Sequence, residues 1–330
     1  MMLFENNSTK AAFYFAAEEY IMMHYRPQEA ALMVWSTDDT VMIGANQVAE
    51  AESDGDYAKS VGIEIIRRPS GGGAIFTDPG TLQYTVILPY RTGDDAKSFV
   101  RDWLAGPVIE TLACFGAGVS IEGRNDIVIE GKKIAGIAQY IKNGYLCSHG
   151  SLLFNTDIAK LARVLTVDRE KIKTKAIASV DARVTNITDY IDEKDIRNFR
   201  EAFIESFEHE GVVRRKAFKP DELEKIGTIR RERFENPDWT YGHGPAYTTK
   251  KKKRFPGGGL EISLDIKGGA IQNIRINGDY MALRPIVALE EALKGAAYRE
   301  DRVLTALKGV DVKLCLGSLG EKELMETLFS

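Results

Sequence analysis

The residues whose types and spacing suggest chemistry begin with the glycine-rich segment RRPSGGGAIFTDPG at positions 67–80. Consecutive glycines cost backbone entropy, so they are expected where the backbone must approach another group closely. Successive N–H groups of such a segment can converge on an anion, and Arg67 or Arg68 can add a charge-assisted hydrogen bond to a phosphate or carboxylate. The alternative is a tight turn between two strands, with both arginines in solvent.

This segment matches neither of two common phosphate-binding motifs. A Walker A motif requires Gly-Lys-Ser/Thr at a fixed spacing, and no such sequence follows Gly73. A dinucleotide-binding fingerprint has spaced glycines followed by a helix, whereas a strand is expected here. An anion site in this segment is therefore a backbone cradle of another kind.

A second candidate segment, GRNDIVIEGKKIAGIAQ, covers residues 123–139. Asn125 and Asp126 precede a predicted strand and Lys133 begins the next one, so Asp126 and Lys133 can face one pocket across a hairpin. A carboxylate near phosphates typically holds Mg²⁺, and a lysine there stabilises the charge that develops in phosphoryl or acyl transfer. The alternative is a charged turn with surface lysines, but the small residues AGIA after Lys133 leave room for a ligand.

A third segment, CSHGSLLF, contains Cys147 and His149. These residues are two apart, so on a strand their side chains point to the same face. A nucleophilic cysteine needs a lowered pKa and usually a nearby base. His149 can be that base, bind a ligand or only satisfy the core. The segment KTKAIASVDARVTNIT, 173–188, indicates a loop.

Helices and strands must position these residues. NNSTKAAFYFAAEEYIMMHY, 6–25, starts with capping residues and continues as a helix. Its buried face is expected to hold Ala12, Phe15, Ala16, Tyr20 and Met23. Strands are expected at 31–37, 40–46, 62–68 and 81–90, the last ended by Pro89, and three more between 125 and 155, with turns at Gly131 and Asn143–Gly144. Helices are expected at 98–115, with a kink or break at Pro107, at 156–165, and at 194–210, where Ile196, Phe199, Phe203 and Phe207 are in register.

The character of the sequence changes after about residue 236. Prolines, glycines and the basic run Lys250–Arg254 suit a linker or domain edge, and we expect the basic run to be a solvated linker. Beyond it, two or three strands and three short helices predict a separate α+β module of ordinary domain size. We therefore expect one domain at 1–245 and a second at 246–330.

Composition excludes several classes of protein. The chain has 330 residues, 44% hydrophobic and 28% charged, with a net charge of −4, which is typical of a globular protein and gives no strong nucleic-acid signal. The N-terminus lacks the pattern of a signal peptide, and no apolar run approaches the ~18 residues needed to span a membrane. Three scattered cysteines without a CxxC pair favour a reducing compartment, so we expect a cytoplasmic protein. The scattered histidines His24, His209 and His243 show no metal-ligand spacing.

Four segments together resemble the lipoate–protein ligase family, in this order and at these spacings: RRPSGGGAIFTDPGTLQY, GRNDIVIEGKKIAGIAQ, HGSLLFN and KAIASVDARVTNIT. The tail from NPDWTYGHGPAY onward resembles that family's C-terminal accessory domain, so the resemblance covers essentially the whole chain. It implies the α/β (α+β type) fold of biotin and lipoate ligases, related to class II aminoacyl-tRNA synthetases. That fold has a mixed, largely antiparallel sheet flanked by helices, here with a small α+β C-terminal domain.

The resemblance also implies a reaction. Lipoate and ATP give lipoyl-AMP and pyrophosphate with Mg²⁺, and the lipoyl group then passes to a specific lysine of a carrier domain. The carriers implied are 2-oxoacid dehydrogenase subunits and the glycine-cleavage H protein. We expect a monomer that needs neither nucleic acid nor membrane, with 1–245 as the catalytic domain.

The same resemblance assigns roles to residues. Lys133 bonds the lipoyl carbonyl oxygen and the phosphate in both half-reactions, and Arg68 with the loop 70–74 closes over the lipoyl chain and phosphate. Asn125 and Asp126 face the metal and phosphate, with Asp126 as the metal ligand, and the segment 173–183 folds over the adenylate. The other expected binding residues are Ser70, Gly71, Gly72, Gly73, Ala74, Ile75, Phe76, Thr77, Asp78, Gly136, Ala138 and His149; among them Ile75, Phe76 and Thr77 line the adenosine side, and Gly136 and Ala138 form the floor.

Departures from the family pattern and related activities leave alternatives open. Pro69 removes any contact from a side chain that relatives carry there, and Asp181 stands where a basic residue is common. An octanoyltransferase of the same fold acts through an acyl-cysteine without ATP, but its relatives carry an arginine where this chain has Gly73 and a cysteine shortly before the lysine. Biotin ligases have an arginine-rich loop unlike SGGGA. A non-catalytic lipoyl-binding module is the alternative of another class.

Overall fold

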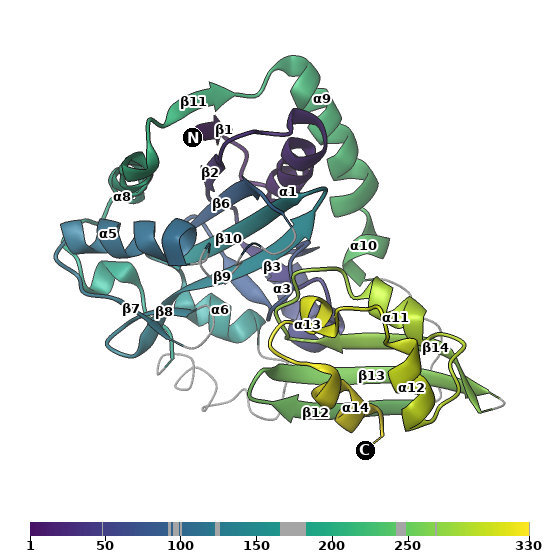
Figure 1. Ribbon diagram of the computed structural model, residues 1–330. Coiled ribbons are helices and arrows are strands. Elements are labelled where there is room, and N and C mark those ends of the chain that lie inside the picture. The colour runs from purple at the N-terminus through teal and green to yellow at the C-terminus, as the bar shows by residue number, and fades with distance from the viewer. Residues whose placement is uncertain are drawn as a thin grey trace.

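The computed structural model (Figure 1) describes residues 1–47, 49–91, 94, 99, 101–122, 126–165, 183–241, 249–267 and 269–329. In this part of the chain the largest sheet has eight strands, in the order β11-β1-β2-β6-β10-β9-β8-β7. β1 runs parallel to β2 and β11, and the other pairs are antiparallel. The predicted mixed, largely antiparallel sheet is confirmed. Its strands are β1 Met2–Glu5, β2 Ala31–Trp35, β6 Thr81–Pro89, β7 Ser120–Glu122, β8 Asp126–Ile129, β9 Lys132–Lys142, β10 Tyr145–Leu153 and β11 Arg214–Ala217.

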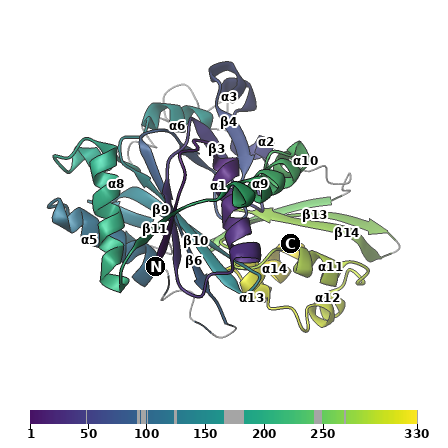
Figure 2. The ribbon, with the colours of Figure 1, turned by 90° about the horizontal axis from the view of Figure 1, so that it is seen from above.

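Helices cover both faces of this sheet, as Figure 2 shows. Successive side chains of a strand point to opposite faces of the sheet, and here each face carries a hydrophobic cluster. In β2, Leu32 and Val34 belong to one cluster, and Met33 and Trp35 belong to the other. The first cluster is covered by α5 Gly106–Cys114 and α8 Ile196–Glu205, and the second by α1 Ala11–Tyr20 and α9 Pro220–Ile229. A helix long and apolar enough to cross a membrane is not found among the described residues.

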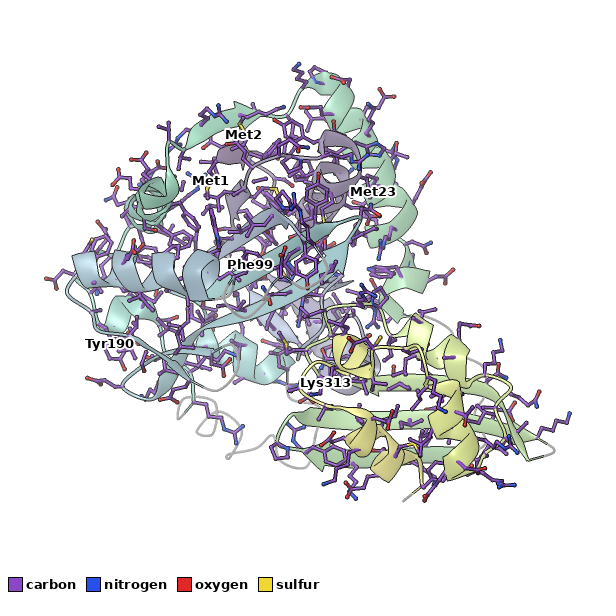
Figure 3. The ribbon with its side chains drawn as sticks, in the orientation of Figure 1. Met1, Met2, Met23, Phe99, Tyr190 and Lys313 are labelled. Atoms are coloured by element: carbon purple, nitrogen blue, oxygen red, sulfur yellow. The ribbon has the colours of Figure 1, made fainter. Side chains whose placement is uncertain are left out.

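The first helix differs from its prediction in two ways. Every residue of α1 is buried, because α1 lies between the sheet and α9, and its last turn widens into a π-helical turn at Ile21–Tyr25. Met23, expected on the buried face, is 41% exposed (Figure 3). The predicted capping residues do not cap α1. Its N-cap position is Lys10, without a side-chain hydrogen bond, and the Thr9 hydroxyl donates to Asp38.

Other local predictions hold. The turns between β8, β9 and β10 have left-handed φ angles at Glu130, Gly131, Asn143 and Gly144, as two-residue hairpin turns require. Pro107 lies in the first turn of α5, where a π-helical turn at Arg101–Ala105 ends, so a break occurs there. The helix α6 Ile158–Val164 is capped by the Asp157 carboxylate, which accepts from the Lys160 N–H.

The glycine-rich segment belongs to a smaller sheet, in the order β4-β3-β5. This sheet consists of β3 Thr40–Ile43, β4 Glu64–Arg67 and β5 Ile75–Thr77. The segment between β4 and β5 therefore leaves and re-enters the same small sheet, which lies beside the end of the large one (Figure 1). The short helices α2 Ala49–Glu52 and α3 Gly55–Val61 accompany it, and with α6 they enclose a separate apolar cluster.

The C-terminal part has its own sheet and its own core. Its strands are β12 Thr249–Phe255, β13 Gly258–Lys267 and β14 Ala270–Gly278, and its helices are α11 Val287–Leu293, α12 Glu300–Ala306, α13 Val312–Leu316 and α14 Glu321–Leu328. The prediction of a solvated linker at Lys250–Arg254 was wrong. These residues form the edge strand β12, where alternate lysines reach solvent, which is a common way to protect a sheet edge. The short helix α10 Pro237–Tyr241 precedes this part of the chain.

Candidate active site

Arg67, at the end of β4, fastens the glycine-rich segment to neighbouring loops. Arg67 is buried, and its guanidinium donates to backbone carbonyls of two other segments. The acceptors belong to the loop after β3 and to α10: Gly44, Ala45, Gln47, Trp239 and Thr240. Because the five N–H donors of one guanidinium can bind several carbonyls at once, Arg67 holds the end of β4, the loop after β3 and α10 together.

Arg68 shapes the glycine loop from the other side. Its Nη2 donates to the carbonyls of Gly71 and Gly73, each at 2.7 Å, and its Nη1 donates to the Met42 carbonyl at 2.9 Å. Burial, with Arg67 beside it, lowers the pKa of Arg68 to about 10, which still leaves the group charged at neutral pH. No carboxylate of the described residues pairs with it. The loop therefore surrounds a buried positive charge that favours an anionic ligand nearby.

A chain of buried hydrogen bonds connects Arg68 to helix α1. Arg68 Nε donates to Ser70 Oγ at 3.1 Å, and Ser70 Oγ lies 2.5 Å from His149 Nε2 on β10. The other ring nitrogen, Nδ1, lies 3.2 Å from Glu18 Oε1. With Arg68 as donor, the hydroxyl proton of Ser70 is directed at Nε2, which leaves Nδ1–H to donate to Glu18. The relay thus ties the glycine loop to the sheet and to α1.

Glu18 can be buried as a carboxylate because three donors surround it. Thr85 Oγ1 donates to Oε1 at 2.8 Å, and the Tyr140 hydroxyl donates to Oε2 at 3.1 Å, in addition to the contact with His149. A buried carboxylate that lacks such partners would be strongly destabilising. The signal in the sequence was the acidic pair Glu18–Glu19 in the otherwise predominantly apolar run AAFYFAAEEY, and it was not used in the prediction.

Lys133 and Asp126 meet across the β8–β9 hairpin. Lys133 Nζ lies 2.7 Å from Asp126 Oδ1, and both side chains remain partly exposed. The register of the hairpin shifts between Ile127 and Val128, so a bulge brings Lys133 to the site. A Cβ added at Gly136 would lie 3.0 Å from Lys133 Nζ, so the glycine allows the lysine to cross the strand.

The backbone of Lys133 also holds the end of the predicted adenylate loop. Lys133 N donates to the Arg183 carbonyl at 2.8 Å, and Thr185 N donates to the Lys133 carbonyl at 3.1 Å. Residues 173–182 of the predicted loop, including Asp181, lie outside the described residues. The described end of that segment is therefore anchored directly at Lys133.

A cavity of about 240 Å³ lies between the glycine loop, the end of the large sheet and α6. We call it the acyl cavity after the expectation that Arg68 and the loop 70–74 close over the lipoyl chain. Its lining includes many of the predicted binding residues: Arg68, Gly72, Gly73, Ala74, Ile75, Phe76, Lys133, Gly136, Ala138 and His149. Ser70, Gly71, Thr77, Asp78 and Asp126 do not line it, and Asn125 lies outside the described residues. The sequence analysis missed Phe15, Trp35, Met42, Gln83, Leu161 and Met281, which are predominantly apolar and gave no chemical signal.

The glycine-rich segment separates this cavity from a larger one. Arg67, Pro69 and Gly71 line a cavity of about 670 Å³ beside the C-terminal part, whereas Arg68 and Gly72 line the acyl cavity. Pro69 therefore faces away from the acyl cavity. Thr77 and Asp78, two other predicted binding residues, make hydrogen bonds within the protein. The Thr77 hydroxyl bonds to the Thr37 hydroxyl, and the Asp78 carboxylate accepts from the Asp157 N–H.

Cys147 shares a face with His149, as predicted, but it is not placed as a nucleophile. The thiol is completely buried and does not line the acyl cavity. Burial, together with the charge of Glu18, raises the pKa of Cys147 well above the ordinary value, so the thiolate is disfavoured. Cys114 and Cys315 are also free thiols.

Glu18, Cys147 and His149 form the one group of three possible metal ligands found in the described residues, with all ligand atoms within 4.8 Å of one another. The group is buried, and its oxygen and nitrogen atoms already have hydrogen-bond partners. Its sulfur and imidazole ligands do not suit Mg²⁺, which prefers oxygen. Asp126 offers a partly exposed carboxylate beside Lys133, which fits a Mg²⁺ ion that is held mainly by substrate phosphates.

Comparisons with known proteins agree over almost the whole chain. Residues 10–208 match the family described as the lipoyl protein ligase A/B catalytic domain, and residues 244–328 match the bacterial lipoate protein ligase C-terminus. The lipoate–protein ligase LplJ of Bacillus subtilis is 32% identical over 319 residues, which cover 95% of each chain. A lipoate–protein ligase of Streptococcus pyogenes is 32% identical and covers 98% of this chain and 96% of its own.

Solved structures show the same similarity. A lipoate–protein ligase A structure bound with ATP has a TM-score of 0.63 and 27% identity, and covers 73% of this chain and 98% of its own. An archaeal bipartite lipoate protein ligase from Thermoplasma acidophilum, studied with its E2 lipoyl domain, has a TM-score of 0.66 and 28% identity over 75% of this chain and 98% of its own. The Plasmodium falciparum LipL1 structure with lipoate covers 99% of this chain and 97% of its own at a TM-score of 0.77, and at 20% identity it supports the fold.

Proposed function

The chain belongs to the lipoate–protein ligase family, and from this premise we propose how its residues carry out the ligase reaction. The protein is a lipoate–protein ligase. It activates lipoate with ATP to lipoyl-AMP and transfers the lipoyl group to a lysine of a carrier domain. The observation that carries the assignment of the site is the position of Lys133, whose ammonium group lines the acyl cavity beside Asp126.

In the first half-reaction, a carboxylate oxygen of lipoate attacks the α-phosphorus of ATP. An O–P bond forms, the bond to the β-phosphate oxygen breaks, and pyrophosphate leaves. Two anions must approach each other, so positive charge is needed around the point of attack. We assign this charge to Lys133 and to the buried guanidinium of Arg68. The N–H groups of Arg68 are used in hydrogen bonds to the glycine loop, so Arg68 acts on the ligand through its electrostatic field.

In the second half-reaction, the amine of the carrier lysine attacks the acyl carbon. The amide C–N bond forms, the C–O bond to AMP breaks, and the proton of the amine passes to the departing AMP phosphate or to solvent water. Negative charge develops on the carbonyl oxygen, and Lys133 is the donor assigned to stabilise it. The apolar residues Phe15, Trp35 and Met42 hold the acyl chain, which lies in the acyl cavity with its carboxyl end toward Lys133.

Asp126 is the proposed ligand for a Mg²⁺ ion that enters with ATP. One carboxylate is sufficient when phosphates supply other ligands, and such an ion neutralises phosphate charge. The ion pair with Lys133 places the same carboxylate where it can also orient the lysine. Ile75 and Phe76 are proposed for the adenosine side, Gly136 and Ala138 for the cavity floor, and Asn125 for the phosphates.

The remaining proposals concern organisation and partners. We place the catalytic domain at 1–245 and the C-terminal domain at 246–330; separate hydrophobic clusters support this division, although the boundary falls between described segments. We propose a cytoplasmic monomer, in keeping with its free cysteines. The proposed acceptors are lipoyl domains of 2-oxoacid dehydrogenases and the glycine-cleavage H protein.

One assay tests the function. Purified protein is incubated with lipoate, ATP, Mg²⁺ and a carrier domain, and pyrophosphate release and the mass of the carrier are measured. We expect both signals, each dependent on ATP. In a parallel incubation, an octanoyl-loaded carrier replaces lipoate and ATP, and transfer from it would instead indicate the octanoyltransferase reaction. Binding of lipoate without pyrophosphate release would indicate a binding module.

A further inference from the structure

One residue in the wall of the acyl cavity comes from the C-terminal part of the chain. Met281 lies in the connection between β14 and α11, and the other described lining residues lie between Phe15 and Val184. Its side chain is also close to the glycine loop, since a Cβ added at Gly72 would lie 2.7 Å from Met281 Sδ. The cavity is therefore completed by a side chain from outside the catalytic domain.

The backbone around Met281 is docked on the catalytic domain by hydrogen bonds. Gly72 N donates to the Tyr280 carbonyl at 3.0 Å, and Ile141 N, near the end of β9, donates to the Leu283 carbonyl at 2.7 Å. Gly278 N donates to the Asn46 carbonyl at 2.8 Å. These three bonds lie on both sides of Met281, so they fix the position from which its side chain enters the cavity.

The same connection is fixed within the C-terminal domain. Tyr280 is completely buried in that domain's core, and its hydroxyl donates to the Ile276 carbonyl at 3.0 Å. A Cβ at Gly317 would lie 1.9 Å from the Met281 carbonyl oxygen, so the end of α13 lies directly against this backbone. Met281 is therefore positioned by the C-terminal domain as a unit.

This docking accounts for two of the three consecutive glycines. A Cβ at Gly71 would lie 2.8 Å from the Tyr280 carbonyl oxygen, and Gly72 combines a φ of +92° with the close sulfur of Met281. At Gly73 an added Cβ would meet nothing within 4 Å. The glycine loop is thus shaped to receive the connection 278–284 as well as a ligand.

We propose that Met281 is a specificity-determining residue, and that the docked C-terminal domain sets the size of the acyl group that the cavity accepts. This proposal rests on the proposed function of the acyl cavity. A thioether side chain is apolar, polarisable and flexible, so it can pack against an alkyl chain or a dithiolane ring. Because cavity space discriminates between substrates that differ by a methylene, a change of volume at this wall changes the preference for chain length.

The test uses the full chain with ATP and measures the pyrophosphate released when one carboxylic acid substrate is added. The four substrates are octanoate, decanoate, dodecanoate and lipoate. We expect Met281→Ala to raise the decanoate-to-octanoate ratio of kcat/KM by about tenfold or more, because these acids differ by two methylenes and a single methylene in an apolar pocket already changes kcat/KM about 10–200-fold. Met281→Trp is expected to lower kcat/KM for lipoate about tenfold, mainly through KM. Met281→Leu, which keeps a similar volume, is expected to retain the wild-type profile.

The matched control is Met325→Ala on α14. Met325 packs against the core of the same C-terminal domain but does not line the acyl cavity, so this variant controls for loss of stability in that domain. Unchanged chain-length profiles in both Met281→Ala and Met281→Trp would overturn the proposal, as would an equal shift in Met325→Ala. Wild-type protein that releases no pyrophosphate with any acid would instead contradict the proposed function itself.

Discussion

The ammonium group of Lys133 lies 2.7 Å from a carboxylate oxygen of Asp126, across a hairpin whose register is shifted by a bulge. Lys133 lines a predominantly apolar cavity, and its ion pair places a negative group directly beside it. A site that joins two anions, a carboxylate and a phosphate, needs positive charge where they meet, and a group such as Lys133 can supply it.

Replacement of Lys133 tests the main catalytic assignment. Lys133→Ala removes the donor to the developing oxyanion, and loss of one such donor typically lowers the rate ~10²–10³-fold. Carrier lipoylation and lipoyl-AMP formation are both expected to fall, while the circular dichroism spectrum stays unchanged. Lys132→Ala is the control, because this neighbour on β9 does not line the cavity. Activity near wild type in Lys133→Ala would refute the assignment.

Asp126→Asn tests the proposed metal ligand. The neutral amide binds Mg²⁺ more weakly, so the Mg²⁺ concentration needed for half-maximal pyrophosphate release is expected to rise about tenfold or more. Glu122→Gln, on the paired strand β7, changes the same charge without touching Lys133 and serves as the control. An unchanged Mg²⁺ requirement in Asp126→Asn, combined with reduced turnover, would limit Asp126 to orienting the lysine.

Ser70→Ala interrupts the relay between Arg68 and Glu18. The substitution leaves His149 Nε2 buried without the serine partner, and an unsatisfied buried polar group costs about 1–3 kcal/mol. We expect a lower free energy of unfolding and a higher KM for lipoate, measured by denaturant titration and by pyrophosphate release. Ser60→Ala, at an exposed site on α3, should change neither quantity. A wild-type KM in Ser70→Ala would show that the relay does not position the glycine loop.

Cysteine labelling separates the ligase from an acyl-cysteine enzyme. Cys114 is exposed, whereas Cys147 is buried with a raised pKa, so iodoacetamide is expected to modify Cys114 long before Cys147. Mass spectrometry of timed digests measures both rates in one sample. Cys147→Ser is expected to keep most of the activity. Rapid modification of Cys147, or a trapped acyl-thioester on it, would count against this assignment.

Glu290 predicts a pH dependence of stability. Burial is the main cause that raises the pKa of this carboxyl group above its value of 4.5 in the unfolded chain. The folded state therefore binds the proton more tightly, and the stabilisation present below the unfolded pKa is lost as pH rises through the folded pKa. We expect Glu290→Gln, which stays neutral, to become more stable relative to wild type as pH rises from 4 to 7. A constant difference in melting temperature over this range would contradict the prediction.

Local sequence determined a large part of this protein. Alternating strands, the Asn143–Gly144 turn, the Asp157 cap and the Lys133–Asp126 spacing are properties of short segments, because hydrogen bonding and side-chain direction repeat over a few residues. The same short-range logic failed at Lys250–Arg254, where pairing with β13 turned a basic run into an edge strand. It also failed at Met23, which lies beyond the buried part of α1.

Tertiary structure alone decided which groups complete the site. Glu18, His149 and Ser70 come from helix, sheet and loop, and their relay exists only because the fold brings together residues that are 79 and 131 positions apart. Met281 and the glycine loop meet in the same way, through packing between two domains. The three glycines at 71–73 predicted a close approach of the backbone to another group, with a tight turn as the alternative. Only the fold decided that, at Gly71 and Gly72, it is the C-terminal domain, since contacts between distant segments depend on packing that local patterns do not encode.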